Sequence, residues 1–154
     1  MPATLEAPAV GTIMPDIAFT DANGAAVTLG ELTAGRRALV YFMRAATCQF
    51  CNAHVQKISG MVAAGELADV AVVIVTPGDA KDVATVTSKL PKAAVTVVAT
   101  GTESRSAVGL SSFLTMQHSG TFVLSATGRV LAQRTATMPT ASFSRSEALA
   151  ALAG

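Results

Sequence analysis

The only two cysteines of this 154-residue chain stand in the segment Thr47-Cys48-Gln49-Phe50-Cys51, which is a C-x-x-C motif. The motif follows Arg37–Met43, a short apolar run typical of a buried strand, and it precedes apolar residues at helical spacing. A helix N-terminus offers unpaired N–H groups and a partial positive charge, and both favour a thiolate over a thiol. Because the thiolate is the nucleophile, this placement predicts redox or metal-binding chemistry at the pair.

The two cysteines are expected to have different roles. Cys48 lies where the helix is expected to begin and where exposure is expected, whereas Cys51 lies one turn further in and should be more buried. We therefore predict that Cys48 attacks a peroxide or a disulfide, and that Cys51 resolves the sulfenic acid or mixed disulfide. The alternative is a buried, reduced pair without a role, which the strand–C-x-x-C–helix context disfavours.

Three other side chains are candidates for the surroundings of the pair. Arg44 lies four residues before Cys48, where its guanidinium would stabilise a thiolate unless it is only a solvated loop charge. His54 follows Cys51 by three residues on the same expected helix. His118 precedes a strand expected to face the Cys48 loop. His118 could approach the sulfurs as a proton carrier or a metal ligand, and His54 could lie one turn below Cys51, although each could instead be an ordinary surface or capped histidine.

The elements that must position these residues can be predicted from periodicity and turn signals. Asn23-Gly24 between two short extended runs indicates a hairpin. Asp79 is a candidate helix cap, and Ser144 with Glu147 forms a capping-box pattern. We expect strands at 17–21, 26–29, 37–43, 70–75, 94–99, 121–125 and 130–134, and helical segments at 31–34, 48–67, 80–90, 103–108 and 148–153, with Leu149 and Leu152 facing inward.

Alternation of strands and helices predicts a parallel central sheet, and the closing hairpin adds antiparallel strands, so the fold class is an α/β sandwich with a mixed sheet. The length favours one domain over residues 1–154. A net charge of +1, without a basic stripe, argues against nucleic-acid binding. The segment 1–10 does not resemble a signal peptide and no apolar run could span a bilayer, so we expect a cytoplasmic protein with no membrane contact.

The segment from Val40 to Cys51 resembles the F-[FY]-R-G-x-W-C-P-x-C pattern of peroxiredoxin-like proteins of the AhpC/TSA (redoxin) family. Phe42, Arg44, Cys48, Phe50 and Cys51 fall on that pattern without a gap. The segment 11–19 is similar to the family's G-x-x-A-P-D-F opening, and 120–124 with Gly128 is similar to its T-F-V-I-D-x-x-G strand. Together these segments span nearly the whole chain in the family's order.

The resemblance implies a thioredoxin-like three-layer sandwich with an N-terminal β-hairpin, and a thiol peroxidase or thiol-disulfide oxidoreductase. It places Thr47 where a hydroxyl could assist the attacking cysteine. It also places Gly120 and Thr121 opposite the sulfurs, so we predict that these two residues and His118 contact the substrate. No organic cofactor is implied. The expected partners are a peroxide or protein disulfide and an external thiol or dithiol reductant, and a homodimer is possible in this family.

Two alternatives stay open at this point. Ala45, His54 and Ser119 stand where peroxidases usually keep a threonine, a glutamate and an arginine, which favours thiol–disulfide exchange without peroxidase activity. Cys48, Cys51 and His118 are also similar to the ligand set of copper-handling thioredoxin-fold proteins of the Sco type. Two thiolates and an imidazole would suit Cu(I) or Zn(II), so a metal-binding module is the second alternative.

Overall fold

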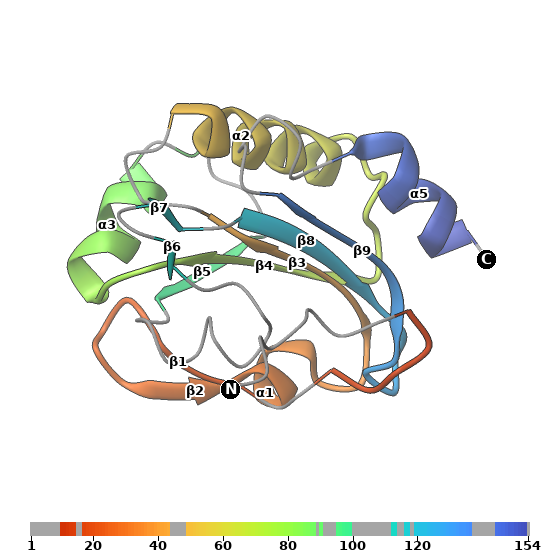
Figure 1. Cartoon of the computed structure of the whole chain (residues 1–154), viewed down its shortest axis with the longest axis horizontal. Helices are drawn as coiled ribbons and strands as arrows, with labels where there is room; N and C mark the ends of the chain where they lie inside the picture. The colour runs from red at the N-terminus through yellow and green to blue at the C-terminus, as the bar shows by residue number, and fades with distance from the viewer. Residues whose placement is uncertain are drawn as a thin grey trace.

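A seven-stranded mixed sheet forms the centre of the computed structural model (Figure 1). The structure describes residues 10–14, 17–43, 49–88, 90, 95–99, 112–113, 116–117, 119–136 and 144–153. In the order β2-β1-β5-β4-β3-β8-β9, the strands are Ala26–Thr28, Ala18–Thr20, Thr96–Ala99, Val70–Thr76, Arg37–Phe42, Ser119–Leu124 and Val130–Ala136. Strands β3, β4 and β5 are parallel, and the remaining pairs are antiparallel.

Helices lie on both faces of this sheet, and the β1–β2 hairpin at its edge packs toward one of these faces (Figure 1). Helices α2 (Gln49–Ala63) and α5 (Arg145–Ala153) lie on one face, and α1 (Leu29–Thr33) lies with the β1–β2 hairpin on the other. Helix α3 (Ala80–Ser88) contacts β4 and β5. The predicted α/β sandwich with a mixed sheet and an N-terminal hairpin is therefore confirmed.

Strand β3 shows why the sheet is buried on both faces. Side chains alternate along a strand, so the apolar residues from Ala38 to Phe42, and Met43 directly after the strand, divide between two cores, and all six have no exposed surface. The core on the α2 side contains Leu39, Tyr41, Met43, Cys51, Val55, Ile58, Met61, Leu67, Val70, Val72, Ile74, Val86, Val123, Ala148 and Leu152. The core on the hairpin side contains Met14, Ile17, Phe19, Leu29, Ala38, Val40, Phe42, Ala71, Val73, Val75, Val98, Phe122, Leu124 and Val130.

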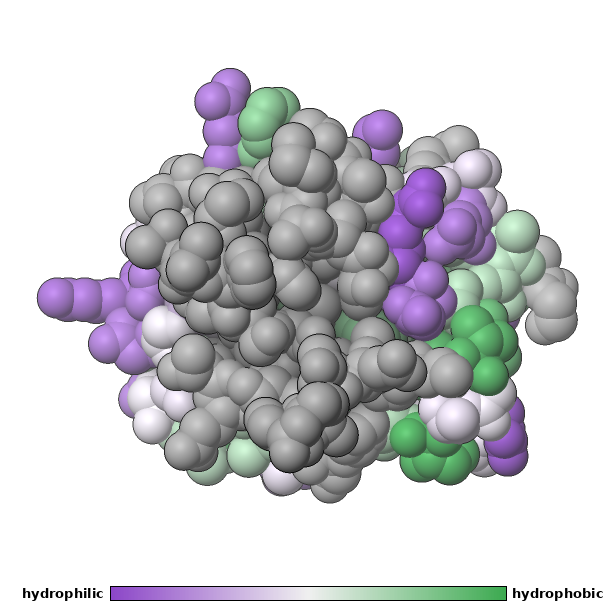
Figure 2. All heavy atoms as spheres, in the orientation of Figure 1, coloured by the Kyte–Doolittle hydropathy of each residue, from purple (hydrophilic) through white to green (hydrophobic). Residues whose placement is uncertain are grey.

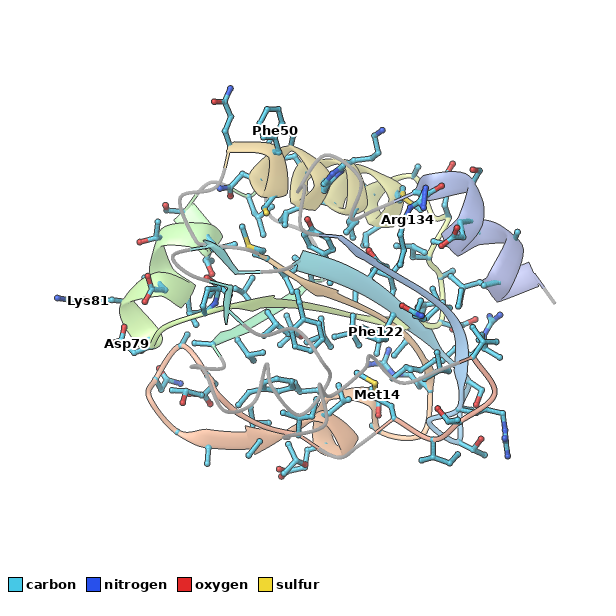
Figure 3. The ribbon with its side chains drawn as sticks, viewed as in Figure 1. Met14, Phe50, Asp79, Lys81, Phe122 and Arg134 are labelled. Carbon is cyan, nitrogen blue, oxygen red and sulfur yellow. The ribbon has the colours of Figure 1, made fainter. Side chains whose placement is uncertain are left out.

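Aromatic contacts hold the hairpin-side core together. The rings of Phe42 and Phe122 meet edge to face with centroids 5.7 Å apart, and Phe19 lies 6.4 Å from Phe42. Such edge-to-face pairs add about 0.5–1.5 kcal/mol beyond the burial of their area. Figure 3 shows Phe122 and Met14 on this side of the sheet. The three rings link β1, β3 and β8, which are far apart in the sequence.

Helix α2 ends earlier than its apolar pattern predicts. The expected limit was Leu67, but the helix stops at Ala63 because Gly65 takes a positive φ of 80°. The N–H of Gly65 donates to the carbonyl of Val62 (3.0 Å), and the N–H of Glu66 donates to the carbonyl of Met61 (3.0 Å). This pair of bonds is a Schellman motif, in which glycine accommodates the left-handed residue.

The predicted caps of the other helices are present. Asp79 accepts a bond from the N–H of Lys81 (3.0 Å), and Asp82 in turn accepts one from the N–H of Asp79 (3.0 Å). Ser144 accepts a bond from the N–H of Glu147 (3.3 Å), so α5 begins directly after Ser144 at Arg145 rather than at the expected residue 148. These side-chain acceptors satisfy N–H groups that have no partner within the helix.

The remaining predictions differ in outcome. The hairpins around Asn23-Gly24 and Ala126–Arg129 are confirmed, with positive φ at both Gly24 and Gly128. A small two-stranded sheet, β6 (Ser112–Phe113) with β7 (Met116–Gln117), was not predicted. The helix expected at 103–108 lies outside the described residues. Of the helices described, none has the length and apolar character needed to cross a membrane.

Candidate active site

The C-x-x-C motif spans the start of helix α2. Strand β3 ends at Phe42, and α2 begins at Gln49, the residue that follows Cys48 in the sequence. Cys51 is the third residue of the helix, and its side chain has no exposed surface. The predicted burial of Cys51 one turn into the helix is confirmed. Arg44, Ala45, Thr47 and Cys48 lie outside the described residues, so their predicted roles stay predictions.

The first turn of α2 favours negative charge at its N-terminus. It contains no acidic residue, so no side-chain carboxylate within it offsets the positive end of the helix dipole. Gln49 and Phe50 are both exposed, and Phe50 is 53% exposed. Figure 3 shows Phe50 pointing away from the sheet at this end of α2. An anionic group at this helix terminus is therefore electrostatically favoured, as the thiolate chemistry requires.

His54 packs against the strand that leads to the motif. It is half-buried on α2, and its ring meets the ring of Tyr41 edge to face, with centroids 5.9 Å apart and an interplanar angle of 74°. Tyr41 has no exposed surface and shares the α2-side core with Cys51. The sequence singled out His54 but not its contact with Tyr41, which depends on how α2 packs across β3.

Strand β8 brings two of the predicted substrate-contact residues beside β3. Gly120 pairs with Phe42, and Thr121 pairs with Tyr41, in an antiparallel register. Thr121 is 5% exposed, and because directly paired residues point to the same face, it lies on the α2 side with Tyr41. Gly120 and Thr121 therefore lie beside the last residues of the strand that leads to Cys48. His118 precedes β8 and lies outside the described residues.

Strand β9 continues this row of side chains across the sheet. Arg134 pairs with Thr121, and its guanidinium lies 4.0 Å from the carboxylate of Glu147 on α5. Both side chains are partly exposed, so this ion pair contributes little to stability. Figure 3 shows Arg134 on the side of the sheet that α2 and α5 cover. Arg134 is a cation of this face that the sequence did not single out, because its place depends on the β8–β9 register.

The metal-binding alternative finds no support in the described part of the chain, which holds no group of three or more His, Cys, Asp or Glu residues able to bind an ion. Two of the three ligands of that alternative, Cys48 and His118, lie outside this part. Cys51 is buried among apolar side chains. The alternative accordingly stays an untested prediction.

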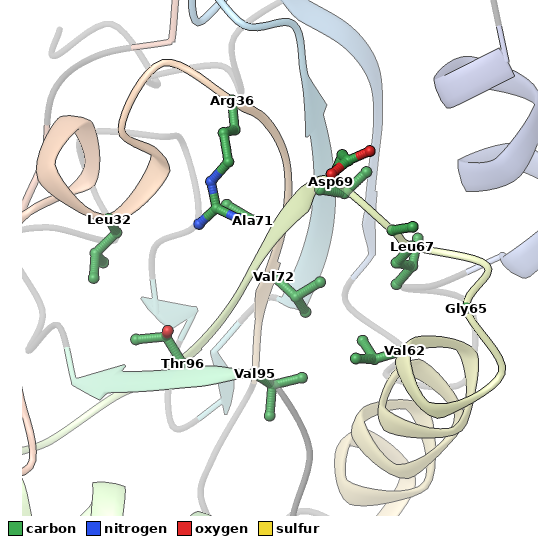
Figure 4. Close-up of a pocket in the computed structure, with 12 residues that line it drawn as sticks. Leu32, Arg36, Val62, Gly65, Leu67, Asp69, Ala71, Val72, Val95 and Thr96 are labelled. Carbon is green, nitrogen blue, oxygen red and sulfur yellow. The ribbon is translucent and has the colours of Figure 1, made fainter.

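A cavity of about 520 Å³ lies at the opposite end of α2 from the cysteines (Figure 4). Its lining comes from the turn after α2 and from the start of β4, including Gly65, Leu67 and Val72. The side chain of Arg36 extends along it between Leu32 and Ala71 (Figure 4). Because the length of α2 separates this cavity from Cys51, the cavity does not belong to the candidate site.

Comparison with protein-family models matches residues 9–152 to the Redoxin family. The match covers more than half of the chain, and the chain therefore belongs to the Redoxin family. This membership supports a thiol-based redox function in general terms. Comparison with curated protein sequences finds no match.

Solved structures share the fold at low sequence identity. Peroxidoxin BcpB from Mycobacterium tuberculosis has a TM-score of 0.78 and 17% identity, with 95% of this chain and 97% of that chain covered. A peroxiredoxin-like protein from Aquifex aeolicus has a TM-score of 0.75 and 12% identity, with 94% and 85% covered. A secreted disulfide oxidoreductase from Mycobacterium tuberculosis, homologous to E. coli DsbE, has a TM-score of 0.63 and 21% identity, with 90% and 95% covered. The fold is therefore the thioredoxin-like fold that the resemblance implied.

Proposed function

We propose that this protein is a peroxiredoxin-like, thiol-dependent redox enzyme that cycles through a disulfide between Cys48 and Cys51. The observation that carries the proposal is the placement of Cys51, fully buried in the first turn of a helix that begins directly after Cys48 in a Redoxin-family chain. Cys48 directly precedes Gln49, the first residue of α2, in the sequence, and a helix N-terminus stabilises a thiolate. Cys51 stands where only a group held beside it can reach its sulfur.

In the first half-reaction, the thiolate of Cys48 attacks one oxygen of a hydroperoxide. The S–O bond forms as the O–O bond breaks, and Cys48 is oxidised to a sulfenic acid. The remaining alkoxide or hydroxide takes a proton and leaves as an alcohol or water. Cys51 then attacks the sulfenic sulfur, the S–S bond forms, and water leaves. An external dithiol reduces the Cys48–Cys51 disulfide and is itself oxidised, which returns the enzyme to its starting state.

Thiol–disulfide exchange is the second candidate function. The observation that favours it is His54, which occupies the position of the peroxidase glutamate and contacts Tyr41 edge to face. In this reaction Cys48 attacks one sulfur of a disulfide, a mixed disulfide forms and a thiol leaves. Cys51 then displaces the second thiol and closes the same Cys48–Cys51 disulfide. Both candidates need the same two cysteines, and they differ in the oxidant.

Stopped-flow mixing of the reduced protein with hydrogen peroxide, an alkyl hydroperoxide and a protein disulfide separates the two candidates. The peroxidase proposal predicts that a peroxide reacts faster than the disulfide, whereas exchange predicts the reverse. In either case Cys48→Ser should abolish turnover. Cys51→Ser should allow one oxidation of Cys48 but no disulfide within the chain. If Cys48→Ser kept full turnover with all three oxidants, the proposed function would be wrong.

A further inference from the structure

His54 lies where it could exchange a proton with the buried cysteine of the pair. It follows Cys51 by three residues on α2, and residues at this spacing are neighbours on a helix surface. Its ring also packs edge to face on Tyr41, with centroids 5.9 Å apart, and Tyr41 belongs to the same buried cluster as Cys51. The helical spacing and the ring contact with Tyr41 on β3 therefore place His54 on the same side of α2 as Cys51.

Closing a disulfide requires Cys51 to lose its proton. Its side chain has no exposed surface, so bulk water does not reach the sulfur. Burial away from water also disfavours a thiolate, because the charged form loses its hydration. A basic group of the protein beside the sulfur would therefore assist the reaction by taking the proton while the new S–S bond forms.

The other titratable or charged groups described on this face are poor acceptors. Lys57 on α2 is a cation, and the phenol of Tyr41 on β3 is a proton donor. The carboxylate of Glu147 on α5 lies beside the guanidinium of Arg134 on β9, and both of these side chains are more than two-fifths exposed. A neutral imidazole accepts a proton in the physiological range, and among these groups only His54 supplies one.

We propose that His54 is the general base that takes the proton of the Cys51 thiol when the Cys48–Cys51 disulfide closes. The proton moves from sulfur to a ring nitrogen of His54, and the sulfur of Cys51 forms its bond to the sulfenic sulfur of Cys48. The S–O bond of the sulfenic acid breaks in the same step. The imidazolium then gives the proton to the leaving hydroxide, so water is released and His54 returns to its neutral form.

The inference rests on the proposed function but not on the identity of the oxidant. In thiol–disulfide exchange, the leaving group is the thiolate of the substrate, and the imidazolium protonates that thiolate instead of hydroxide. The bond formed and the proton taken from Cys51 are the same. His54 would therefore act in the second step of either reaction, and the first step, attack by Cys48, should not depend on it.

The chain offers a natural reporter for this step. It contains one tyrosine and no tryptophan, so its intrinsic fluorescence comes from Tyr41, whose ring touches that of His54. A change of charge on His54 should therefore alter the emission of the protein. Rapid mixing with one equivalent of oxidant can follow Tyr41 emission, while acid quenching, alkylation and mass analysis count the sulfenic acid and disulfide formed.

Two variants separate the role of His54 as a base from its role in packing against Tyr41. His54→Phe keeps a ring against Tyr41 but removes the base, and His54→Gln keeps a polar side chain without an imidazole. Lys57→Gln is the matched control, because it changes an exposed side chain one turn further along α2. A fourth variant, His54→Ala, opens space for imidazole added to the buffer.

The expected result is a selective loss of the second step. Both His54→Phe and His54→Gln should oxidise at Cys48 at the wild-type rate but close the disulfide about 100-fold more slowly at pH 7. The rate of disulfide closure in the wild type should rise with pH and reach a plateau between about pH 5 and pH 8, where histidine ordinarily changes charge. This dependence on pH should vanish in both variants. Lys57→Gln should match the wild type. Added imidazole should restore part of the closure rate of His54→Ala.

The inference is overturned if His54→Phe and His54→Gln both close the disulfide at a rate within twofold of the wild-type rate and keep the wild-type pH profile. It is also overturned if added imidazole leaves His54→Ala unchanged. A different result, in which the wild type forms no oxidised Cys48 with any oxidant, would contradict the proposed function itself and the inference with it. The two failures are distinguishable, because the first concerns only the closure step.

Discussion

Cys51 owes its expected role to the absence of water around its sulfur. The side chain has no exposed surface and lies among apolar residues of the α2-side core. A thiol in such a place is protected from reagents in solution, and only a group held beside it within the protein can reach it. Burial therefore favours the proposed role of Cys51 as the resolving residue over a role as the attacking one.

This burial predicts slow alkylation of Cys51 in the folded protein. In Cys48→Ser, where Cys51 is the only cysteine, iodoacetamide should react at least about 100-fold more slowly than in the same variant unfolded in guanidinium, because reaction requires local opening. Mass analysis over time measures both rates. Equal rates in the folded and unfolded protein would show that the sulfur is accessible, contrary to the structure.

At the scale of single residues, the sequence indicates the chemistry better than it indicates the contacts. The C-x-x-C spacing and the preceding apolar run were enough to predict that Cys51 is buried one turn into a helix. The contact of His54 with Tyr41 could not be predicted, because thirteen positions separate the two residues and their meeting depends on the crossing of α2 over β3. The row of Tyr41, Thr121 and Arg134 likewise depends on strand register.

Among the elements, α2 carries the site and has a defined stop. Its Schellman motif needs the positive φ of Gly65, whereas Gly60 lies within the helix and has open space around it. A side chain at Gly65 would be strained in the left-handed region, and a side chain at Gly60 would only reduce the flexibility of the unfolded chain. A side chain is therefore unfavourable at Gly65, in the turn after the helix, and favourable at Gly60 within it.

Substitution of these glycines by alanine should change stability in opposite directions. We expect Gly65→Ala to lower the free energy of unfolding by about 1 kcal/mol. Gly60→Ala should raise it by about 0.5–1 kcal/mol. Urea denaturation followed by circular dichroism measures both changes. The assigned end of α2 would be wrong if Gly65→Ala were as stable as the wild type or more stable.

Elements with strong local signals were predicted closely. β3 and β4 are continuous apolar runs, and their observed limits, Arg37–Phe42 and Val70–Thr76, differ from the expected ones by one residue. The end of α2 was misplaced because Leu67 continues the apolar spacing in the turn after the helix. The two-residue strands β6 and β7 were missed because strands so short have no periodicity to detect.

On the scale of the whole molecule, one hydrogen bond joins residues 115 positions apart. The guanidinium of Arg37, at the start of β3, donates to the carbonyl of Leu152 near the end of α5 (2.5 Å). The last turn of α5 contains no basic residue of its own, so a cation from β3 compensates its negative end. This bond fixes α5 to β3.

Arg37→Met should therefore loosen α5 while leaving the sheet intact. We expect a loss of about 1–2 kcal/mol of stability and faster hydrogen exchange confined to the amides of α5. Arg36→Met is the matched control, because Arg36 is exposed beside the distant cavity and should change stability by less than about 0.5 kcal/mol. Unchanged exchange in α5 of Arg37→Met would rule out this role.

The C-x-x-C motif lies at one end of α2, and the cavity of about 520 Å³ lies at the other. The class of fold could be predicted because strand–helix alternation and two hairpins suffice to define it. The order of the strands and their register could not, since they depend on pairings between distant segments. On the face in Figure 2, hydrophobic atoms of the described residues form separate groups among hydrophilic ones.

The central claim is that Cys48 and Cys51 form one redox pair, and peptide mapping of the protein after treatment with one equivalent of oxidant tests it most directly. The account predicts a single cross-linked species, lighter than the reduced chain by two hydrogens, in which a Cys48–Cys51 disulfide replaces both thiols and a dithiol restores them. Two thiols that remain open to alkylation after unfolding, whether the oxidant was a peroxide or a disulfide, would contradict it.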